Sequence, residues 1–317
     1  MRPRALQNLL DSVSKQSVYP HEILIIDGSH DAETQKMLGQ QSYPGLQYFK
    51  VDQANRGLTK QRNYGISKLN SDTSIVCFLD DDVVLEPDFF EQLLHPFSDA
   101  EVVGVDGWIT NENRWEKCSN DVHIPKHAKV FDGYFLPLSS RDRLRAILGL
   151  YPYDVQPGNI PTYGHGKSSL PPTGKSYEVE HIMGGITAYR RSVFSHIGFS
   201  TFFEGYGLYE DFDFSVRASK YGKLLTNTAA RLAHYHEQGG RPNMYKYGKM
   251  VIRNGWHVWR LKHPKPSISS KLKWYTISLL LSLVRLSSLT SDGFREFLGR
   301  STALMGLFFK KPSHKTI

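Results

Sequence analysis

The sequence predicts an α/β fold: a doubly wound, mostly parallel β-sheet with helices on both faces. In residues 22–109, short apolar runs alternate with helical stretches of about a dozen residues, the pattern of βαβ units. One of these runs, residues 75–79, stops abruptly at three consecutive carboxylates. The chain has 317 residues, of which 40 % are hydrophobic and 22 % charged, so it can bury a full globular core.

The first expected element is a helix, although a doubly wound fold normally opens on a strand. Residues 3–17 carry leucines and a valine at helical spacing behind Pro3. Further along the chain we expect strands at 22–26, 46–51, 75–80 and 102–109, with helices at 31–41, 57–69 and 87–97.

Residues 111–178 break this alternation. They are rich in Pro, Gly, His, Tyr and Ser, and only 139–150 reads as a helix. A connection of this length in a compact domain is usually a lid or a binding region. We therefore expect an irregular insertion here.

The chain after the insertion carries a glycine pair, acidic residues and two histidines. Gly184 and Gly185 enter an apolar run, and three acids at 210, 211 and 213 precede a helix expected from Phe214. Acids at a helix start also complement the helix dipole, so a structural role is an alternative for them. His234 and His236 follow each other closely at the end of a short strand, and we expect at most one of them to meet an acidic site.

The three consecutive carboxylates, Asp80, Asp81 and Asp82, are the strongest chemical signal. Adjacent acids repel one another unless a cation lies among them. Ligands of α/β sheets gather beyond the carboxyl ends of the strands, and hard oxygen ligands suit Mg²⁺ or Mn²⁺. The alternative is a solvated acidic turn.

The net charge of +8 is unevenly distributed. Residues 241–317 contain 15 Lys or Arg and two acids, a net +13, whereas residues 1–240 carry −5. A basic tail indicates a polyanionic partner, and no recognised nucleic-acid module is present, so we expect an anionic membrane surface and no nucleic acid.

The apolar stretch 274–284 lies inside this tail. Its 11 residues are too short to span a bilayer as a helix. Ser278, Ser282 and Arg285 would form a narrow polar stripe on such a helix, which could lie in the membrane interface. The alternative is a core helix packed on the main domain.

Cysteine content and the N-terminus bear on the compartment. Only Cys77 and Cys118 are present, which argues against a disulfide framework and fits a reducing cytosol. Residues 1–4 are basic but no apolar segment follows, so we expect no signal peptide. Together with the basic tail, this predicts a cytoplasmic protein peripheral on the inner face of the membrane.

These features together resemble family 2 of the glycosyltransferases, the inverting, nucleotide-sugar-dependent enzymes with the GT-A fold, and especially the bacterial polysaccharide and rhamnosyl-type transferases. The resemblance extends over almost the whole chain, in the order of the family. It is carried by Asp27 after its strand, Arg56-Gly57 with Arg62-Asn63, Asp80-Asp81-Asp82 with Pro87-Asp88, Gly184-Gly185 with Arg190-Arg191, Glu210-Asp211-Phe212-Asp213 with Arg217, then His236 and Arg253-Asn254.

The resemblance implies roles for these residues in binding a nucleotide-diphosphate sugar and a divalent metal, Mg²⁺ or Mn²⁺. Asp27 would accept a hydrogen bond from the base, and Arg62 would lie near the diphosphate or brace the acids. Asp80 and Asp82 would hold the metal, with His236 as a further ligand in preference to His234. The donor site would also include Asp80, Asp81, Gly184 and Gly185.

Catalysis would depend on Asp211, the implied general base that takes the proton of the acceptor hydroxyl. Glu210, Asp213 and Arg253 would support it. The acceptor would be a saccharide or a lipid-linked glycan, as in the assembly of cell-surface polysaccharide or glycolipid. The implied domains are a nucleotide-sugar-binding half at 1–110, the insertion at 111–178, an acceptor and catalytic half at 179–240 and a basic helical tail at 241–317.

One departure from the family is plain. Members normally open on a strand that lines the nucleotide pocket, and this chain lacks that first strand. A non-catalytic scaffold of the same pathway is therefore an alternative. A sugar-nucleotide nucleotidyltransferase is less favoured, because the glycine-rich phosphate loop that it needs is missing from the sequence.

Overall fold

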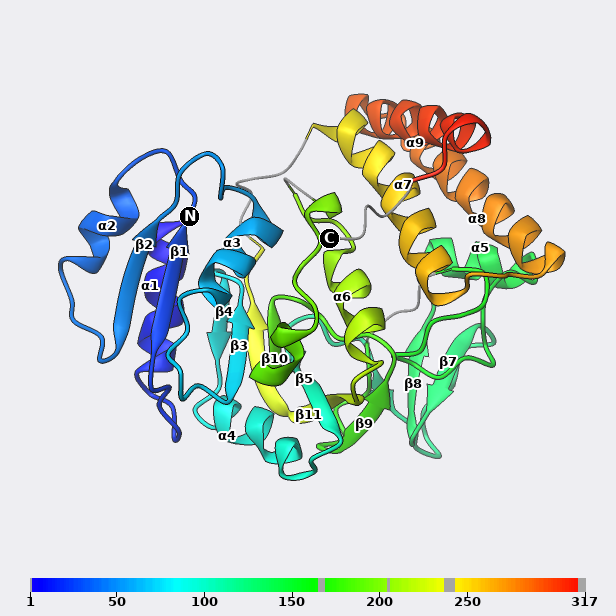
Figure 1. The fold of residues 1–317 in the computed structure, drawn as a ribbon. Coiled ribbons are helices and arrows are strands. Elements are labelled where there is room, and N and C mark those ends of the chain that lie inside the picture. Colours follow the sequence, from blue (N-terminus) through cyan, green and yellow to red (C-terminus); the bar gives the residue numbers. More distant parts are fainter. Residues whose placement is uncertain (1, 165–168, 204–205, 237–242, 313–317) are drawn as a thin grey trace. The chain divides into compact units, whose positions relative to one another are not determined.

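The computed structural model contains two compact units (Figure 1). The first consists of Met1–Asn113 and Pro172–Gly239, and the second of Arg114–Pro171 and Gly240–Ile317. The segment Arg114–Pro171 lies within the insertion predicted at 111–178, while the predicted boundary at 240 lies outside the described residues. The structure describes residues 2–164, 169–203, 206–236 and 243–312.

The first unit opens on helix α1 (Pro3–Val13), as expected, followed by a small parallel sheet. This sheet consists of β1 (Ile23–Asp27) and β2 (Leu46–Lys50), with helix α2 (Glu33–Leu38) between them in the chain. Among the residues that the structure describes, no strand connects this pair to the larger sheet.

The larger sheet has six strands and confirms the α/β class. Its order is β3 (Ile75–Leu79), β10 (Ile186–Arg190), β5 (Val102–Ile109), β11 (Lys223–His234) and β4 (Val83–Leu85), with β9 (Ser176–Val179) also paired to β11. The sheet is more mixed than expected. Only β5 and β11 pair in parallel, because β10 returns antiparallel between β3 and β5, and β4 and β9 run antiparallel to β11.

The strand directions bring the chemically interesting segments to one edge. Since β10 is antiparallel to both β3 and β5, the strands β3, β5 and β11 run the same way. Their carboxyl ends therefore meet at one edge of the sheet, where β4 and β10 begin. The acids after β3, the glycines before β10 and the histidine that ends β11 all lie at this edge.

Helices cover both faces of this sheet. Ile186 and Ala188 of β10 belong to the hydrophobic core shared with α1 and with α4 (Phe89–Leu94). Tyr189 points to the opposite face, since side chains alternate along a strand. Its ring packs edge-on against Phe214 of α6 (Glu210–Ala218), at 4.8 Å between centroids. Helix α3 (Leu58–Ile66) packs on β1.

The second unit combines the insertion with the C-terminal helices. The insertion, expected to be irregular, contains a three-stranded antiparallel sheet and helix α5 (Ser140–Ile147). The tail forms α7 (Met244–Lys262), α8 (Ile268–Leu286) and α9 (Ser291–Phe309), whose core includes Trp259 stacked on Trp274. None of the described helices is long and apolar enough to cross a membrane. The small sheet has β6 (Glu116–Lys117), β7 (Ala128–Phe131) and β8 (Tyr134–Pro137). In the first unit, short 3₁₀ helices lie at His95–Ser98, Arg191–Ser195 and Thr201–Phe203.

Candidate active site

The acids that follow β3 lie beside the last residue of β11. Possible metal-ligand atoms of Asp80, Asp82 and His234 all lie within 4.8 Å of one another. Two backbone hydrogen bonds fix this arrangement: Asp80 N–H donates to the Gly185 carbonyl at 2.8 Å, and Tyr235 N–H donates to the Asp82 carbonyl at 2.8 Å. Two oxygen donors and one nitrogen donor suit a divalent ion such as Mn²⁺.

Arg2 also contacts this acidic group, which the sequence analysis did not anticipate. Its guanidinium lies 2.8 Å from Asp82 Oδ2 and also pairs with Asp81, whose other oxygen accepts the Arg2 backbone N–H at 3.1 Å. The cation offsets part of the repulsion between adjacent carboxylates. No local sequence pattern indicates this contact, because residues 2 and 81 are 79 positions apart.

Arg62 of α3 braces the acids from another side. Its side chain is 9 % exposed and forms an ion pair with Glu210, while Nη2 donates to the Gly184 carbonyl at 3.0 Å and lies 3.9 Å from Asp80 Oδ1. Its guanidinium also lies over the Phe199 ring. The resemblance placed Arg62 either near the diphosphate or against the acids, and in the structure its guanidinium lies against the acids.

The two adjacent glycines, Gly184 and Gly185, leave room for the carboxylates. A Cβ on Gly184 would lie 2.6 Å from Glu210 Oε1 and 3.1 Å from Asp211 Cβ. A Cβ on Gly185 would lie 2.2 Å from Asp80 Oδ2. Side chains at either position would therefore displace the acids, so consecutive glycines allow Asp80 and Asp211 to approach the same stretch of backbone.

Asp106 of β5 fixes the backbone just before this glycine pair, and the sequence analysis did not single it out. It is fully buried, and its Oδ2 accepts the Met183 N–H at 2.8 Å. Burial raises the pKa of Asp106 to about 7. A single acid inside an apolar strand is the only sequence signal that could have suggested this role.

The acids at positions 210, 211 and 213 lie within helix α6. The helix begins at Glu210 rather than at Phe214, because acids in the first turn complement the helix dipole. Glu210 is buried against Arg62, and burial raises its pKa to about 7 although the Arg62 charge opposes this. Asp211 is only partly buried, and desolvation raises its pKa too.

Asp213 forms an ion pair within its own helix, and Arg253 belongs to the second unit. Asp213 is fully buried and accepts a hydrogen bond from Arg217 Nε at 2.8 Å, a contact within α6. Arg253 is exposed on α7 in the second unit. Their supporting roles remain predictions.

Asp27 lies at the carboxyl end of β1, as predicted, and is fully buried. It accepts hydrogen bonds from the Ser29 backbone at 2.7 Å and from the Tyr48 hydroxyl at 2.8 Å. Burial alone would raise its pKa, but these bonds and the charge of Lys50 outweigh burial and lower the pKa. Contact with a nucleotide base remains a prediction for this residue.

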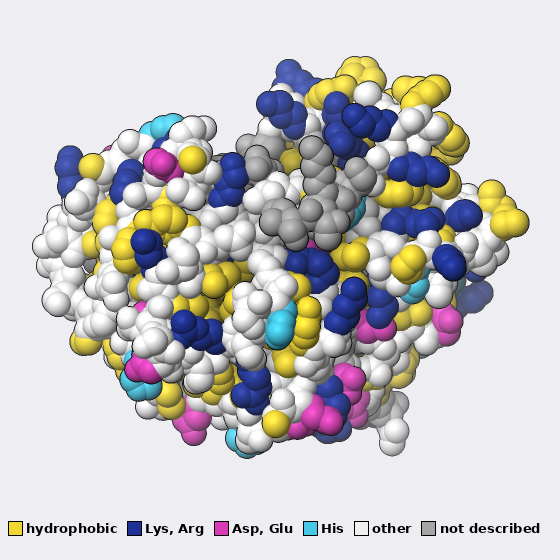
Figure 2. Space-filling model, in the orientation of Figure 1, with side chains coloured by type: hydrophobic (Ala, Val, Ile, Leu, Met, Phe, Trp, Pro, Cys, Tyr) yellow, Lys and Arg dark blue, Asp and Glu magenta, His cyan; other side chains and the backbone are white. Residues whose placement is uncertain are grey.

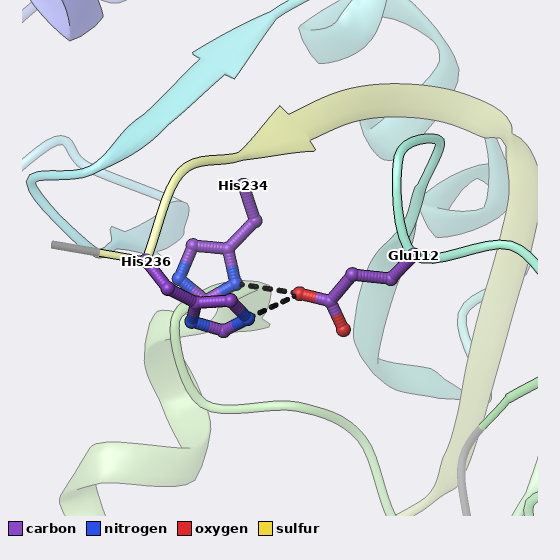
Figure 3. A group of neighbouring side chains, drawn as sticks. All are labelled: Glu112, His234 and His236. Atoms are coloured by element: carbon purple, nitrogen blue, oxygen red, sulfur yellow. Dashed lines mark ion pairs between the residues drawn. The ribbon is translucent and has the colours of Figure 1, made fainter.

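The two histidines take different positions at the end of β11. His234, which the resemblance made the less favoured ligand, has Nε2 3.3 Å from Asp82 Oδ1. His236 has Nε2 2.8 Å from Glu112 Oε1, and Glu112 also faces His234 (Figure 3). The structure thus brings His234 to the acids and groups His236 with Glu112, a residue that no sequence signal had indicated.

Comparison with known sequences gives two family matches and two curated relatives. The profile described as "Glycosyl transferase family 2" matches residues 1–198, and "N-terminal domain of galactosyltransferase" matches residues 164–246. The "O-antigen chain rhamnosyltransferase RfbN" of Salmonella typhimurium is 27 % identical over 32 % of this chain and 31 % of its own length. The "Uncharacterized glycosyltransferase YwdF" of Bacillus subtilis is 28 % identical over 40 % of this chain and 44 % of its own.

Among solved structures, the fold is similar to that titled "Crystal structure of GalNAc-T7 with UDP, GalNAc and Mn2+". The TM-score is 0.51 at 18 % identity, over 92 % of this chain and 51 % of that one. The chain therefore spans about a third to a half of the length of these relatives. The first profile covers more than half of the chain, and with the α/β architecture it establishes that this chain belongs to glycosyl transferase family 2 and has the GT-A fold.

Proposed function

We propose that this chain transfers a sugar from a nucleotide-diphosphate sugar to an acceptor hydroxyl with inversion at the anomeric carbon. The observation that carries the proposal is the placement of Asp80 and Asp211 against the consecutive glycines Gly185 and Gly184. One carboxylate that can bind a metal and one that can act as a general base thus lie against the same short stretch of backbone.

Asp211 acts as the general base in this proposal. It accepts the proton of the acceptor hydroxyl as the hydroxyl oxygen forms a bond to the anomeric carbon. The bond from that carbon to the phosphate oxygen breaks on the opposite face, and the nucleoside diphosphate departs. Glu210 is the poorer candidate for the base because Arg62 already engages its buried carboxylate.

Asp80, Asp82 and His234 would hold the divalent ion, and the resemblance adds His236 as a candidate. A bound Mn²⁺ or Mg²⁺ offsets the negative charge of the departing diphosphate. Asp27, Arg62 and Asp81 remain the proposed donor-side residues, together with the glycine pair. The solved structure titled with UDP and Mn²⁺ supports this choice of donor and metal.

The test is a transfer and donor-hydrolysis assay of the purified chain with a panel of nucleotide sugars. Activity should vanish in chelator and return with Mn²⁺ or Mg²⁺. Asp82→Ala should remove most of the metal-dependent donor binding. Asp72→Ala is the matched control, because it removes an exposed carboxylate in the turn before β3 but leaves the group of Asp80, Asp82 and His234 intact.

Full activity in chelator would contradict the metal site, and no turnover of any nucleotide sugar would contradict glycosyl transfer itself. The comparisons favour glycosyl transfer over a scaffold or a nucleotidyltransferase. The curated relative named as an O-antigen chain rhamnosyltransferase supports a polysaccharide or glycolipid acceptor.

We further propose that the second unit attaches the protein to the inner face of an anionic membrane, where a lipid-linked acceptor is available. In α8 the polar Ser282 is fully buried, whereas Leu272 and Leu279 are 64 % and 53 % exposed. Water-soluble helices normally show the reverse arrangement. Figure 2 shows hydrophobic side chains interspersed with Lys and Arg over the C-terminal helices.

Exposed apolar residues on α8 recur at helical spacing. Ile268, Leu272, Leu279 and Leu283 follow one another at steps of 4, 7 and 4 residues, so they line one side of the helix. Lys271 and Lys273 lie within this stretch and add positive charge. An apolar stripe with basic residues beside it is typical of a helix that lies in a membrane interface.

A further inference from the structure

The segment after β5 is attached to the end of β11 by side-chain hydrogen bonds. The Asn111 side chain donates through Nδ2 to the His234 carbonyl at 2.8 Å and accepts the His234 N–H through Oδ1 at 2.9 Å. Thr110 N–H donates to the Leu232 carbonyl at 2.8 Å. These bonds fix the residue that follows Asn111, which is Glu112, beside the His234 ring.

The two ring nitrogens of His234 face different carboxylates. Nε2 lies 3.3 Å from Asp82 Oδ1, and Nδ1 lies 3.2 Å from Glu112 Oε1. A neutral imidazole has one N–H and one nitrogen with a lone pair. When Nδ1–H donates to Glu112, the lone pair of Nε2 points toward the acids. Metal-binding histidines typically have such an arrangement, with the other ring nitrogen bonded to a carboxylate.

We propose that Glu112 is a positioning residue for this metal site, an inference that rests on the proposed function. Glu112 holds His234 in the tautomer and orientation that aim Nε2 at the space shared with Asp80 and Asp82. The Glu112 carboxylate is itself held by His236, whose Nε2 lies 2.8 Å from Oε1 (Figure 3). His236 then acts through Glu112 rather than as a direct ligand.

A second metal held by Glu112, His234 and His236 is the competing interpretation, since their ligand atoms also lie within 4.8 Å of one another. The observations favour the positioning role for two reasons. Glu112 and His236 are 43 % and 61 % exposed, so they form an open surface group. Moreover, His234 would have to bridge two ions through both ring nitrogens, which requires the loss of both ring protons.

The experiment measures Mn²⁺ binding to the full chain by calorimetry, with affinity and stoichiometry as the readouts. Glu112→Ala should weaken Mn²⁺ binding about 10- to 100-fold, the usual effect of losing such an outer partner. Glu112→Gln retains a carbonyl oxygen that accepts the Nδ1–H, so it should restore most of the affinity. The wild-type stoichiometry should be one Mn²⁺ per chain.

Glu101→Ala is the matched control. Glu101 pairs with Lys223 where β5 and β11 begin, at the opposite edge of the sheet from Glu112, and its substitution removes the same single negative charge. Wild-type affinity in Glu112→Ala would overturn the inference. Two ions in the wild type that fall to one in Glu112→Ala would overturn it in favour of the second metal. A wild type that binds no Mn²⁺ would overturn the proposed metal site together with this inference.

Discussion

Each of the two units contains a buried ion pair between arginine and glutamate, and the two differ in the charges around them. In the second unit, Glu296 of α9 is 3 % exposed and lies 2.7 Å from Arg285 Nε of α8 and 2.6 Å from Arg300. Two cations surround one anion there. In the first unit, Arg62 pairs with Glu210, but Asp80 and Asp211 lie close by.

The difference shows that a buried ion pair is not by itself a sign of a functional site. Buried pairs are common structural devices and contribute little net stability. The first unit is distinguished by its excess of carboxylates, since five acids, Asp80, Asp81, Asp82, Glu210 and Asp211, have two arginines among them. Such an excess favours a cation, whereas in the second unit the two arginines already compensate the charge of Glu296.

The largest expected effect tests the acids of the first unit, where Asp211 is the proposed general base and Glu210 the partner of Arg62. Asp211→Asn should keep donor binding but lower turnover by about 10²- to 10⁴-fold, because the acceptor hydroxyl loses its general base. Steady-state kinetics with separate donor-binding titrations would measure this. Glu210→Gln should act mainly on stability, lowering the Tm, because it leaves the buried Arg62 charge unpaired. A stable but inactive Glu210→Gln beside an active Asp211→Asn would reverse the two roles.

The next largest effect tests whether the second unit binds to an anionic membrane through the exposed apolar residues of α8. The triple change Leu272→Ser, Leu279→Ser and Leu283→Ser should weaken binding to phosphatidylglycerol vesicles by about 10²-fold, since about 1 kcal/mol of apolar burial is lost at each position. Vesicle sedimentation measures the partitioning. Val18→Ser changes an exposed apolar residue of the first unit and should have no effect.

Salt and lipid charge provide a further control for this prediction. Binding should weaken as salt rises, because each Lys or Arg near an anionic surface contributes about 1 kcal/mol of screened attraction. Equal sedimentation of the wild type with neutral and anionic vesicles would contradict the membrane proposal.

A matched pair of glycine substitutions compares backbone crowding in the two units. Gly185→Ala should weaken Mn²⁺ binding about 10- to 100-fold, because the new Cβ would lie 2.2 Å from Asp80 Oδ2 and displace that carboxylate. Gly306→Ala on α9 meets open space and should stabilise its helix by about 0.5–1 kcal/mol. Calorimetry measures the Mn²⁺ affinity of Gly185→Ala, and thermal unfolding measures the stability of Gly306→Ala. Unchanged Mn²⁺ affinity in Gly185→Ala would remove Asp80 from the metal site.

The last prediction concerns the pH dependence of stability and the buried Asp106. Its pKa is about 7 in the folded chain, against an ordinary value of 3.8, so the folded state holds a proton that the unfolded state releases between these values. The stability contributed by Asp106 is therefore present below about pH 4 and lost as pH rises toward 7, by at most about 1.4 kcal/mol per pH unit. Asp106→Asn should flatten this dependence in urea unfolding at pH 5, 6 and 7. A slope unchanged by the substitution would show that Asp106 is ionised throughout.

Much of the fold could be predicted from local patterns. Hydrophobic periodicity located α1, the strands around the acids and the helices between them, because these features depend on neighbouring residues in the chain. Helix α6 was placed four residues late, since its acidic first turn was assigned to the preceding loop. The antiparallel return of β10 was not predicted, because strand direction depends on a pairing partner more than 100 positions away.

The sequence by itself determined which chemical groups are available: consecutive acids at a strand end, a glycine pair, acids at a helix start and a basic tail. Only the tertiary structure decided which groups meet. Arg62 reaches Glu210 across 148 positions, and Arg2 reaches Asp81 across 79. His234 and His236 are two positions apart and both approach Glu112, and the pairing of His234 with Val83 decided that His234 lies beside Asp82. The physical reason is that strand register, set by backbone hydrogen bonds between distant segments, fixes the direction of every side chain at the sheet edge.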